Sequence, residues 1–467
     1  MENILKKLQD KKIAILGLGI ENYCLIKYLL KNKINCEITV CDKREFDKLA
    51  EIKNFASLQK IKKVKWRLGK NYDKNLAEFD ILFRSPGWPL SKLPPLLAKE
   101  RAGVRLSSPM KLFFNLCPTR NIIGVTGTKG KGTTASLIYH ILKKAGKKAW
   151  LGGNIGVAPF EFIDKIKKND WVVLELSSFQ LEDMAASPRI AVITNFHKEH
   201  LAPTDPNNPN YHRTLKDYWK AKSNIFKWQN KRDYLVISKN FQFSIFNFQS
   251  ISNFKIFNFQ NLYKKNYKGK IIFFDKSDLA SKLIGEHNEE NIAAAVEVAK
   301  IVGINNEIIK KAVVSFNGLE HRLEFVKKIN GVKYYNDSFA TTPESAITAL
   351  KSFTEPIVLL AGGAEKKSDF KQLAKEIKKR VQFMVLLDGK ATPRLKKELT
   401  KANFPRNKMF LAKNIKQAVR EAGKNAAKGG IVLLSPACAS FGMFRNYKER
   451  GKLFKEEIKN KTIAGFV

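Results

Sequence analysis

Residues 122–134 read Ile122-Ile123-Gly124-Val125-Thr126-Gly127-Thr128-Lys129-Gly130-Lys131-Gly132-Thr133-Thr134, an apolar run that leads into glycines around a lysine. This order is typical of a buried strand, a phosphate-binding loop and a helix. Glycines allow the backbone to turn its N–H groups toward a phosphate, and the following helix adds its positive N-terminal end. Lys131 can reach the outer phosphates of a nucleotide. We therefore predict a nucleoside triphosphate site made of Gly127, Thr128, Lys129, Gly130, Lys131, Gly132, Thr133 and Thr134.

The spacing in this loop departs from the usual phosphate-loop pattern at two positions. Val125 stands where the first glycine belongs, and Gly132 stands where the metal-binding hydroxyl belongs. From the loop alone, a glycine-rich turn with a structural role is an open alternative. The sequence on either side of the loop favours nucleotide binding.

The length and composition limit the class of protein. With 467 residues the chain exceeds one ordinary core and indicates about three domains. There is no apolar run of about 20 residues, and the charged Met1–Asp10 leads straight into an expected strand, so we expect neither a membrane span nor a signal peptide. The five cysteines lack C-x-x-C spacing, which argues against a disulfide framework or a zinc site. We expect a cytoplasmic monomer with reduced thiols.

The formal net charge of +42 would normally suggest a nucleic-acid partner. The lysines, however, are spread along the whole chain together with abundant Asn, Ile and Phe, which is typical of a compositional bias and not of one binding face. We therefore expect no specific nucleic acid. The charge should still attract polyanionic substrates such as nucleotides.

The N-terminal region, for which we predict a domain over residues 1–112, begins as a Rossmann-like unit. Lys11–Gly19 reads as a strand and a glycine turn, an amphipathic helix follows, and a second strand ends at Asp42. A dinucleotide fingerprint would need a third glycine near the place of Asn22, so the pattern gives weak support to NAD. Asp42 could bind a ribose or a base, or could simply cap a turn.

The central region, residues 113–317, reads as a parallel sheet of the phosphate-loop ATPase kind. Its strand 171–175 is apolar throughout and ends in Glu175, where open α/β sheets bind ligands, so Glu175 is a candidate magnesium ligand. Near residues 241–260 a low-complexity repeat reads as an insertion. Asn288 and Asn291, about one helical turn apart, could read the edge of a base. Lys222 lies in helix-like sequence, where a solvated face is the alternative.

The C-terminal region, residues 318–467, contains four expected strands that each end in a polar or glycine turn, mostly with helix-like sequence after them. This pattern predicts a second Rossmann-like, doubly wound unit. The expected fold is therefore α/β with three domains.

Several short motifs together carry a resemblance that spans nearly the whole chain. They are Thr126–Lys131, Gly153–Gly156, Leu174–Leu181, His287-Asn288 with Asn291, His321-Arg322, Asn336–Ser338 and Leu434–Ser440. In this order and spacing the chain resembles the Mur ligase family. The last motif and the tail Phe444–Gly451 point within that family to the member that adds glutamate.

The resemblance implies an ATP-dependent amide ligase of peptidoglycan precursor synthesis. ATP would phosphorylate the alanyl carboxylate of UDP-N-acetylmuramoyl-L-alanine, and the amine of D-glutamate would attack the acyl phosphate. Two Mg²⁺ ions and protein cations would carry the charge that develops. The same ligation with L-glutamate, and a ligase like folylpolyglutamate synthetase, are the alternatives within the superfamily. A basic nucleic-acid-binding ATPase is the alternative from another class.

The resemblance also assigns roles by position. Lys131, Glu175, His200 and Lys222 would be catalytic, with Glu175, His200 and a carbamate on Lys222 as metal ligands. ATP would also contact Asn288, Asn291, Arg322 and Asp337. The muramoyl nucleotide would contact Gly19, Asp42, Ser85, Gly87, Asn154 and Ser177. The incoming glutamate would contact Thr341, Lys366, Ser440, Phe441 and Tyr447.

Four positions depart from the family pattern. Because Gly132 replaces a hydroxyl residue, Thr133 is expected to take over its role at the metal. Glu199-His200-Leu201-Ala202 has Glu and Ala where aspartates are frequent. Phe339 stands where many members have a lysine, which leaves Lys366 or another cation to act there. Asn22 breaks the first glycine pattern and weakens the uridine contacts predicted beside it.

Overall fold

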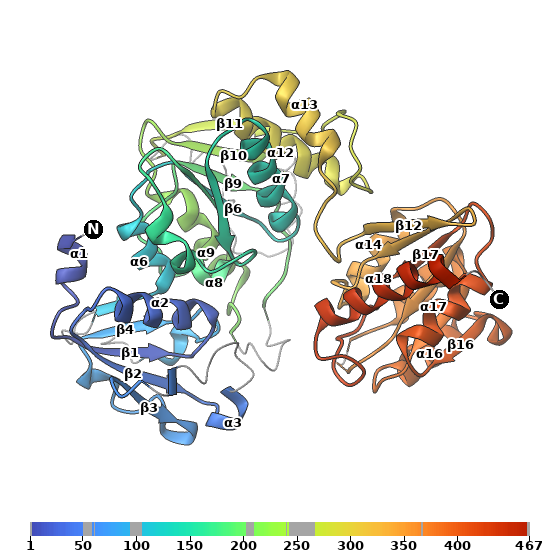
Figure 1. Ribbon diagram of the computed structural model, residues 1–467, viewed down its shortest axis with the longest axis horizontal. Helices are drawn as coiled ribbons and strands as arrows, with labels where there is room; N and C mark the ends of the chain where they lie inside the picture. Colours follow the sequence, from blue (N-terminus) through green and yellow to red (C-terminus); the bar gives the residue numbers. More distant parts are fainter. Residues whose placement is uncertain are drawn as a thin grey trace, which may run out of the picture. The chain divides into compact units, whose positions relative to one another are not determined.

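The protein contains three β-sheets, which follow one another along the chain (Figure 1). The computed structural model describes residues 2–49, 58–59, 61–93, 105–201, 210–239, 241, 267–365 and 368–464. Two compact units divide the chain, one formed by Met1–Asp278 with Glu290–Ala312 and the other by Leu279–Glu289 with Val313–Val467. The first two sheets lie in the first unit, and the third sheet lies in the second.

The first sheet has five parallel strands in the order β3-β2-β1-β4-β5. They are β1 Lys12–Leu16, β2 Glu37–Asp42, β3 Val64–Leu68, β4 Ile81–Arg84 and β5 Arg105–Ser107. The helices of this region are α1 Glu2–Lys6, α2 Ile20–Lys31, α3 Phe46–Leu49 and α6 Pro109–Leu116. The glycine turn between β1 and α2 and the segment after β4 therefore meet at the carboxyl edge of this sheet.

The second sheet has six parallel strands in the order β11-β10-β9-β6-β8-β7. They are β6 Ile122–Thr126, β7 Ala149–Gly153, β8 Trp171–Glu175, β9 Ile190–Ile193, β10 Tyr234–Ser238 and β11 Lys270–Phe274. The helices between β6 and the third sheet are α7 Lys131–Lys144, α8 Ser178–Leu181, α9 Leu215–Lys227, α12 His287–Ile301 and α13 Asn306–Ser315. Strands β6 and β8 are buried throughout because neighbours cover both of their faces.

The third sheet is mixed and has the order β12-β13-β17-β14-β15-β16. The strands are β12 Glu324–Ile329, β13 Val332–Asn336, β14 Ile357–Ala361, β15 Val381–Leu387, β16 Met409–Ala412 and β17 Ile431–Leu434. Its helices are α14 Pro343–Lys351, α15 Lys371–Arg380, α16 Thr392–Lys401, α17 Ile415–Lys424 and α18 Tyr447–Ala464. Only the edge strand β12 pairs antiparallel among the described strands, and the sequence patterns did not predict this strand.

Short 3₁₀ turns complete the described backbone. They are η1 Gly69–Asn71, η2 Leu76–Glu78, η3 Leu90–Lys92, η4 Pro159–Glu161, η5 Ile163–Lys165 and η6 Arg406–Lys408.

The first two sheets share one hydrophobic core, which places their carboxyl edges relative to each other. Aromatic rings join α2, α6 and η4: the ring centroids of Tyr28 and Phe160 are 5.0 Å apart, and those of Phe113 and Phe160 are 6.2 Å apart. Packing of this kind contributes beyond the buried area alone. The first unit therefore behaves as one packed body.

Two predicted features lie outside the described residues: the repeat within residues 245–260 and Lys366. Among the described helices, none combines the length and apolar character that crossing a bilayer requires.

Candidate active site

The predicted phosphate loop lies between β6 and α7, as the sequence indicated. Gly127 has φ +149°, and a Cβ there would lie 2.0 Å from Oγ1 of Thr194. Gly130 has φ +80°, and its Cβ would lie 2.1 Å from Oδ1 of Asn291. Both positions need glycine for conformation and for space. The ammonium of Lys131 donates to the carbonyl of Thr128 at 3.0 Å.

Asn195, which follows β9, fixes this loop. Its side-chain oxygen accepts from the backbone N–H of Lys129 at 2.8 Å, its amide donates to the carbonyl of Lys129 at 3.1 Å, and its own carbonyl accepts from the N–H of Thr128 at 3.0 Å. The hydroxyl of Thr194 adds a bond to the Lys129 carbonyl at 2.6 Å. Two loop amides are therefore bound within the protein, and the residues from Gly130 onward form the start of α7.

The side chain of Lys222 on α9 is buried beneath the same loop, with 1% of its surface exposed. Its Nζ donates to the carbonyl of Gly127 at 2.6 Å and approaches Oγ1 of Thr126 at 3.4 Å. The ring centroid of Tyr218, one helical turn earlier, is 4.8 Å away. Burial lowers the pKa of this amine well below its ordinary value, and the nearby charge of Lys131 lowers it further. Lys222 is therefore suited to be a neutral amine.

Glu175 ends β8 next to the loop, and its side chain is buried. Its Oε1 accepts from the side-chain amide of Asn154 at 3.1 Å, while its carbonyl accepts from the backbone N–H of Asn154 at 2.9 Å. A Cβ on Gly153 would lie 2.2 Å from that carbonyl. The Gly153-Asn154 turn thus approaches Glu175 closely enough to orient its carboxylate.

His200 lies in the left-handed region with φ +59° and carries its ring to the edge of this cluster. The ring centroids of Phe179 and Tyr218 are 5.3 and 5.8 Å away. Partial burial lowers the pKa of His200, the charge of Glu199 opposes that effect, and the charges of Lys131 and Lys129 strengthen it. A neutral imidazole is the form that can coordinate a metal.

The four residues predicted to be catalytic therefore come together. The charges of Lys131 and Glu175 act on Lys222, and the charge of Lys131 also acts on His200. All four lie at the carboxyl edge of the central sheet or on segments that cover it. Among the described residues, no group of three or more His, Cys, Asp or Glu side chains converges as a ready metal site.

The two predicted amides on α12 differ in their surroundings. Oδ1 of Asn291 accepts from the hydroxyl of Thr134 at 3.2 Å and lies against Gly130, so this residue borders the phosphate loop. The side-chain amide of Asn288 donates to the carbonyl of Ile284 at 2.8 Å, one turn before the helix. Thr133 is buried in the first turn of α7.

In the first sheet, the glycine turn and the segment after β4 meet as expected. A Cβ on Gly17 would lie 2.6 Å from Oγ of Ser85. Asp42 accepts from the N–H of Leu18 at 2.7 Å and pairs with Arg44 at 2.7 Å. Burial alone would raise the pKa of Asp42, but the hydrogen bonds from Arg44 and Leu18 outweigh it and keep the pKa below its usual value. The ionised Asp42 therefore holds the turn that contains Gly19.

Two side chains, Asn210 and Arg84, connect this region to the central one. The amide of Asn210 donates to the carbonyl of Pro86, between Ser85 and Gly87, at 2.8 Å. Arg84, 1% exposed at its side chain, donates to the carbonyl of Phe179 at 2.7 Å and to Oδ1 of Asp183 at 3.2 Å. Just before Phe179, the Ser177 hydroxyl caps α8 by accepting from the N–H of Gln180 at 3.2 Å.

In the second unit, Arg322, Asp337, Thr341, Ser440, Phe441 and Tyr447 lie on the loops after β13 and β17, before β12, or at the start of α18. Asp337 accepts from the hydroxyl of Ser435 at 2.8 Å. Burial raises its pKa to about 7, so this carboxyl can donate as well as accept near neutrality. The guanidinium of Arg322 stacks 4.6 Å from the ring centroid of Phe339, which is 5.0 Å from that of Tyr447. Thus Phe339 supports a cation where the family pattern suggested a lysine.

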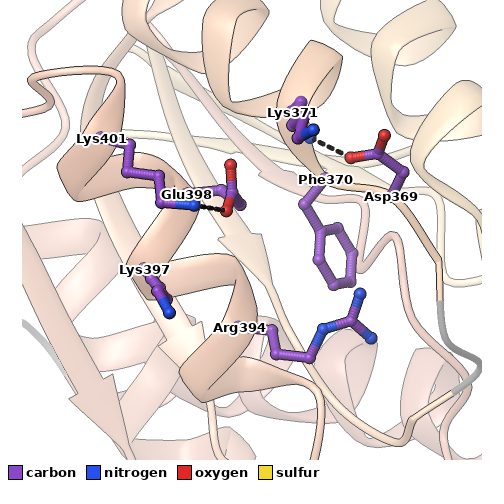
Figure 2. A pocket seen from close by; sticks show the side chains of 7 residues that line it. All are labelled: Asp369, Phe370, Lys371, Arg394, Lys397, Glu398 and Lys401. Atoms are coloured by element: carbon purple, nitrogen blue, oxygen red, sulfur yellow. Dashed lines mark hydrogen bonds and ion pairs between the residues drawn. The ribbon is translucent and has the colours of Figure 1, made fainter.

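A separate pocket of about 360 Å³ lies between α15 and α16 (Figure 2). It is lined by Asp369, Phe370, Lys371, Arg394, Lys397, Glu398 and Lys401. None of these described residues was a predicted site residue. Lys401 pairs with Glu398 at 2.7 Å and Arg394 pairs with Glu365 at 2.8 Å. These two ion pairs neutralise part of the positive charge that lines the pocket.

Sequence reasoning assigned no role to several residues that shape the site. Asn195 fixes the phosphate loop, and Tyr218 contacts both Lys222 and, at 3.2 Å, the hydroxyl of Thr128. Nε2 of His212 forms a hydrogen bond with the hydroxyl of Ser178 at 2.9 Å, and burial lowers the pKa of this histidine to about 4. Tyr218 precedes Lys222 by four residues, the spacing at which two side chains can meet on one face of a helix. The roles of Arg84 and Asn195 depend on contacts distant in sequence.

The sequence matches three domain families in order: "Mur ligase MurD-like, N-terminal domain" over residues 11–108, "Mur ligase middle domain" over 125–299 and "Mur ligase, glutamate ligase domain" over 321–438. It is 39% identical to a UDP-N-acetylmuramoylalanine--D-glutamate ligase of Acetivibrio thermocellus, with 97% of each chain covered. A ligase of the same name from Clostridium kluyveri is 38% identical over 96% of each chain. The chain therefore belongs to the Mur ligase family.

Solved structures agree on the fold. The MurC ligase of Thermotoga maritima has a TM-score of 0.56 at 16% identity and covers 97% of this chain and 100% of its own. MurF of the same organism, solved with ADP, has a TM-score of 0.54 at 16% identity and covers 99% of this chain and 100% of its own. A folylpolyglutamate synthase of Mycobacterium tuberculosis has a TM-score of 0.52 at 12% identity and covers 74% of this chain and 93% of its own. The predicted α/β fold class is confirmed.

Glu21 on α2 makes the stability of the packing between the first two sheets depend on pH. It accepts a hydrogen bond from Gln180, and burial raises its pKa from 4.5 to about 7. The folded protein thus holds this proton more tightly than the unfolded chain, so the stabilising contribution is complete below pH 4.5 and is lost as the pH rises through about 7. Glu21→Gln, which does not titrate, should gain stability relative to the wild type over that range, by on the order of 3 kcal/mol.

Urea unfolding at about pH 5 and about pH 8 measures this change, with the exposed Glu307→Gln on α13 as the control. A stability difference between Glu21→Gln and the wild type that is the same at both pH values would contradict the assignment.

Proposed function

We propose that this protein adds D-glutamate to UDP-N-acetylmuramoyl-L-alanine, with ATP as the energy source, in the synthesis of peptidoglycan precursors. The observation that carries the proposal is the similarity, over nearly the whole chain, to ligases named for D-glutamate addition. The cluster of Lys131, Glu175, His200 and Lys222 supports it because it combines a cation, a carboxylate, an imidazole and a buried amine beside a phosphate loop.

The folate alternative has weaker support. The folylpolyglutamate synthase of Mycobacterium tuberculosis covers 74% of this chain, whereas the D-glutamate ligase of Acetivibrio thermocellus covers 97%. In this proposal the first sheet, with its glycine turn and its Ser85–Gly87 segment, would bind the muramoyl nucleotide. We therefore assign the three regions 1–112, 113–317 and 318–467 to the muramoyl nucleotide, to ATP, and to glutamate with part of ATP.

In this proposal the phosphate loop and α7 bind the ATP phosphates. The N-terminal end of α7 favours negative charge, and Lys131 leaves the Thr128 carbonyl to hold the outer phosphates. Asn291, which borders Gly130, and Asn288 face the adenine. Arg322 and Asp337 contact ATP from the last domain, with Phe339 orienting the guanidinium.

Magnesium would be held by Glu175, His200, the hydroxyl of Thr133 and a carbamate formed on Lys222. The residues fit this role because burial lowers the pKa of the Lys222 amine and so favours the neutral form that reacts with CO₂, and a carbamate there would add anionic oxygen ligands beside Glu175. When bound, Mg²⁺ neutralises charge on the transferring phosphoryl group. Tyr218 and the Gly127 carbonyl hold the amine in place.

The substrates would occupy the edges of the first and last sheets. Gly19, Asp42, Ser85 and Gly87 would contact the uridine diphosphate, and Asn154 and Ser177 the muramoyl-alanyl end. Thr341, Lys366, Ser440, Phe441 and Tyr447 would hold the incoming glutamate. After ATP phosphorylates the alanyl carboxylate, the glutamate amine attacks the acyl carbon, phosphate leaves, and the amine loses a proton. We further propose that the protein acts as a monomer in the cytoplasm.

Phosphate release tests the proposal directly. With ATP, Mg²⁺ and the muramoyl-alanine nucleotide, release should require D-glutamate and should not occur with L-glutamate. Lys131→Ala should lower the rate by at least about a hundredfold because a phosphate contact is lost, whereas the exposed Lys143→Ala on the same helix should not. Release that depends on folate, or on added DNA or RNA, would overturn the proposal in favour of those alternatives.

Lys222→Ala tests the carbamate separately. Loss of the anionic ligand should lower the rate strongly, and added acetate or formate should restore part of it by filling the vacated volume. The exposed Lys220→Ala on the same helix is the matched control and should keep the wild-type rate. A Lys222→Ala variant that short carboxylates cannot rescue would remove the support for carbamylation.

A further inference from the structure

Arg450 on α18 is a buried cation of the second unit that the proposed mechanism does not use. It is 0% exposed, yet within the described part of the chain it forms no ion pair with a carboxylate. Burying an unpaired guanidinium is costly, and arginine cannot avoid the cost by losing its proton at neutral pH. Burial lowers its pKa only to about 10, so the cation persists. The hydrogen bonds of the guanidinium must therefore compensate for the cost of burying it.

Those hydrogen bonds join two loops at the carboxyl edge of the third sheet. Nε and Nη2 donate to the hydroxyl and the carbonyl of Ser338, at 2.9 and 2.8 Å, in the loop after β13. Nη1 donates to the carbonyl of Cys438 at 3.3 Å, in the loop after β17. A planar guanidinium with fixed donors sets both distance and orientation, which a lysine could not do.

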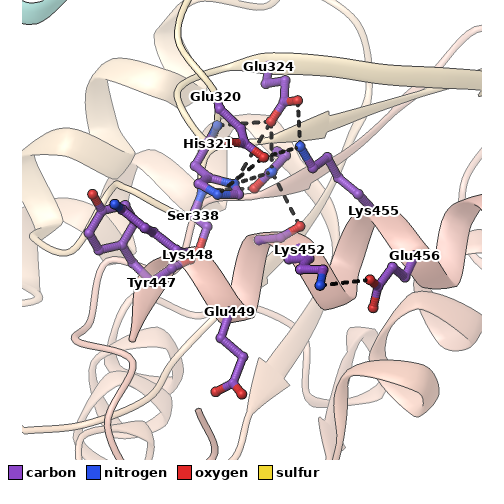
Figure 3. Close-up of polar contacts among 12 residues, drawn as sticks. Glu320, His321, Glu324, Ser338, Tyr447, Lys448, Glu449, Lys452, Lys455 and Glu456 are labelled. Atoms are coloured by element: carbon purple, nitrogen blue, oxygen red, sulfur yellow. Dashed lines mark hydrogen bonds and ion pairs between the residues drawn. The ribbon is translucent and has the colours of Figure 1, made fainter. Parts of the chain in front are cut away.

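The contacts around Arg450 extend this link. The hydroxyl of Ser338 donates to the carbonyl of Tyr447 at 2.8 Å, at the start of α18 (Figure 3). Gly451, the next residue, allows close packing, since a Cβ there would lie 2.2 Å from Nδ1 of His321. Nδ1 of His321 lies 2.9 Å from the side-chain amide of Asn336, which ends β13. Arg450 and Gly451 thus hold α18 in contact with the loop after β13 and the loop after β17.

We infer that Arg450 is a positioning residue that holds the loop carrying Asp337 and the loop carrying Ser440 at the spacing needed for ATP and glutamate to bind together. The inference rests on the proposed function, because that function assigns Asp337 to ATP and Ser440, Phe441 and Tyr447 to glutamate. Arg450 itself, fully buried behind these loops, touches neither substrate.

The test compares Arg450→Gln and Arg450→Lys with Arg445→Gln, whose side chain is 87% exposed, as the matched control. Arg450→Gln should raise KM for both glutamate and ATP by roughly tenfold and leave KM for the muramoyl nucleotide within about twofold. Arg450→Lys, which keeps the charge, should recover part of the loss. A change in kcat with all three KM values unchanged, an equal rise in all three, or no change would overturn the inference.

Two further measurements separate this inference from folding and from the proposed function. Thermal unfolding identifies variants that are merely unstable. If Arg450→Gln does not fold, Arg450→Lys becomes the test: a smaller rise in KM for glutamate and ATP alone supports the inference, and unchanged KM values overturn it. Hydrogen exchange of residues 337–341 and 435–441 needs no turnover, and both segments should exchange faster in the variant than in the wild type. If the wild type shows no release that depends on glutamate, the proposed function fails, and unchanged exchange in the variant overturns the positioning role itself.

Discussion

The contact on which the active site depends is the one between the buried amine of Lys222 and the carbonyl of Gly127, at 2.6 Å. It requires a glycine at the loop, because a side chain there would meet Thr194, and it requires α9 to pack directly beneath β6. Removed from water and next to Lys131, the amine has a lowered pKa. One packing arrangement therefore fixes the shape of the phosphate loop and the chemical state of the lysine behind it.

Buried side-chain donors also join separate segments at the other two sheets, where the donors are charged guanidinium groups. Arg84 connects the segment after β4 with the start of α8, and Arg450 connects the loops after β13 and β17. In each sheet the carboxyl edge consists of loops that the strands alone would leave independent. Buried donors with fixed geometry convert these loops into defined surfaces.

The sequence predicted the parts of this structure that depend on local pattern. Apolar runs and glycine positions predicted three of these parts. They are the strand, loop and helix around Lys131, the buried strand that ends at Glu175, and the glycine turn after β1. Resemblance to the family supplied Lys222, which spacing could not distinguish from a solvated lysine. The roles of Asn195, Arg84 and Arg450 depend on partners about 65 to 110 residues away, and such contacts leave no periodic signal. The antiparallel strand β12 pairs locally with β13, but its residues are half-buried or exposed without alternation, so it lacks the pattern that identifies a strand.

The most direct test of the account concerns the state of Lys222, because the central claim is that burial keeps its amine neutral and able to react. The measurement is carbon-13 NMR of the protein equilibrated with labelled bicarbonate. The account predicts a carbamate resonance that is present in the wild type and lost in Lys222→Arg. A spectrum without any signal that depends on Lys222, under conditions where the enzyme is active, would contradict it.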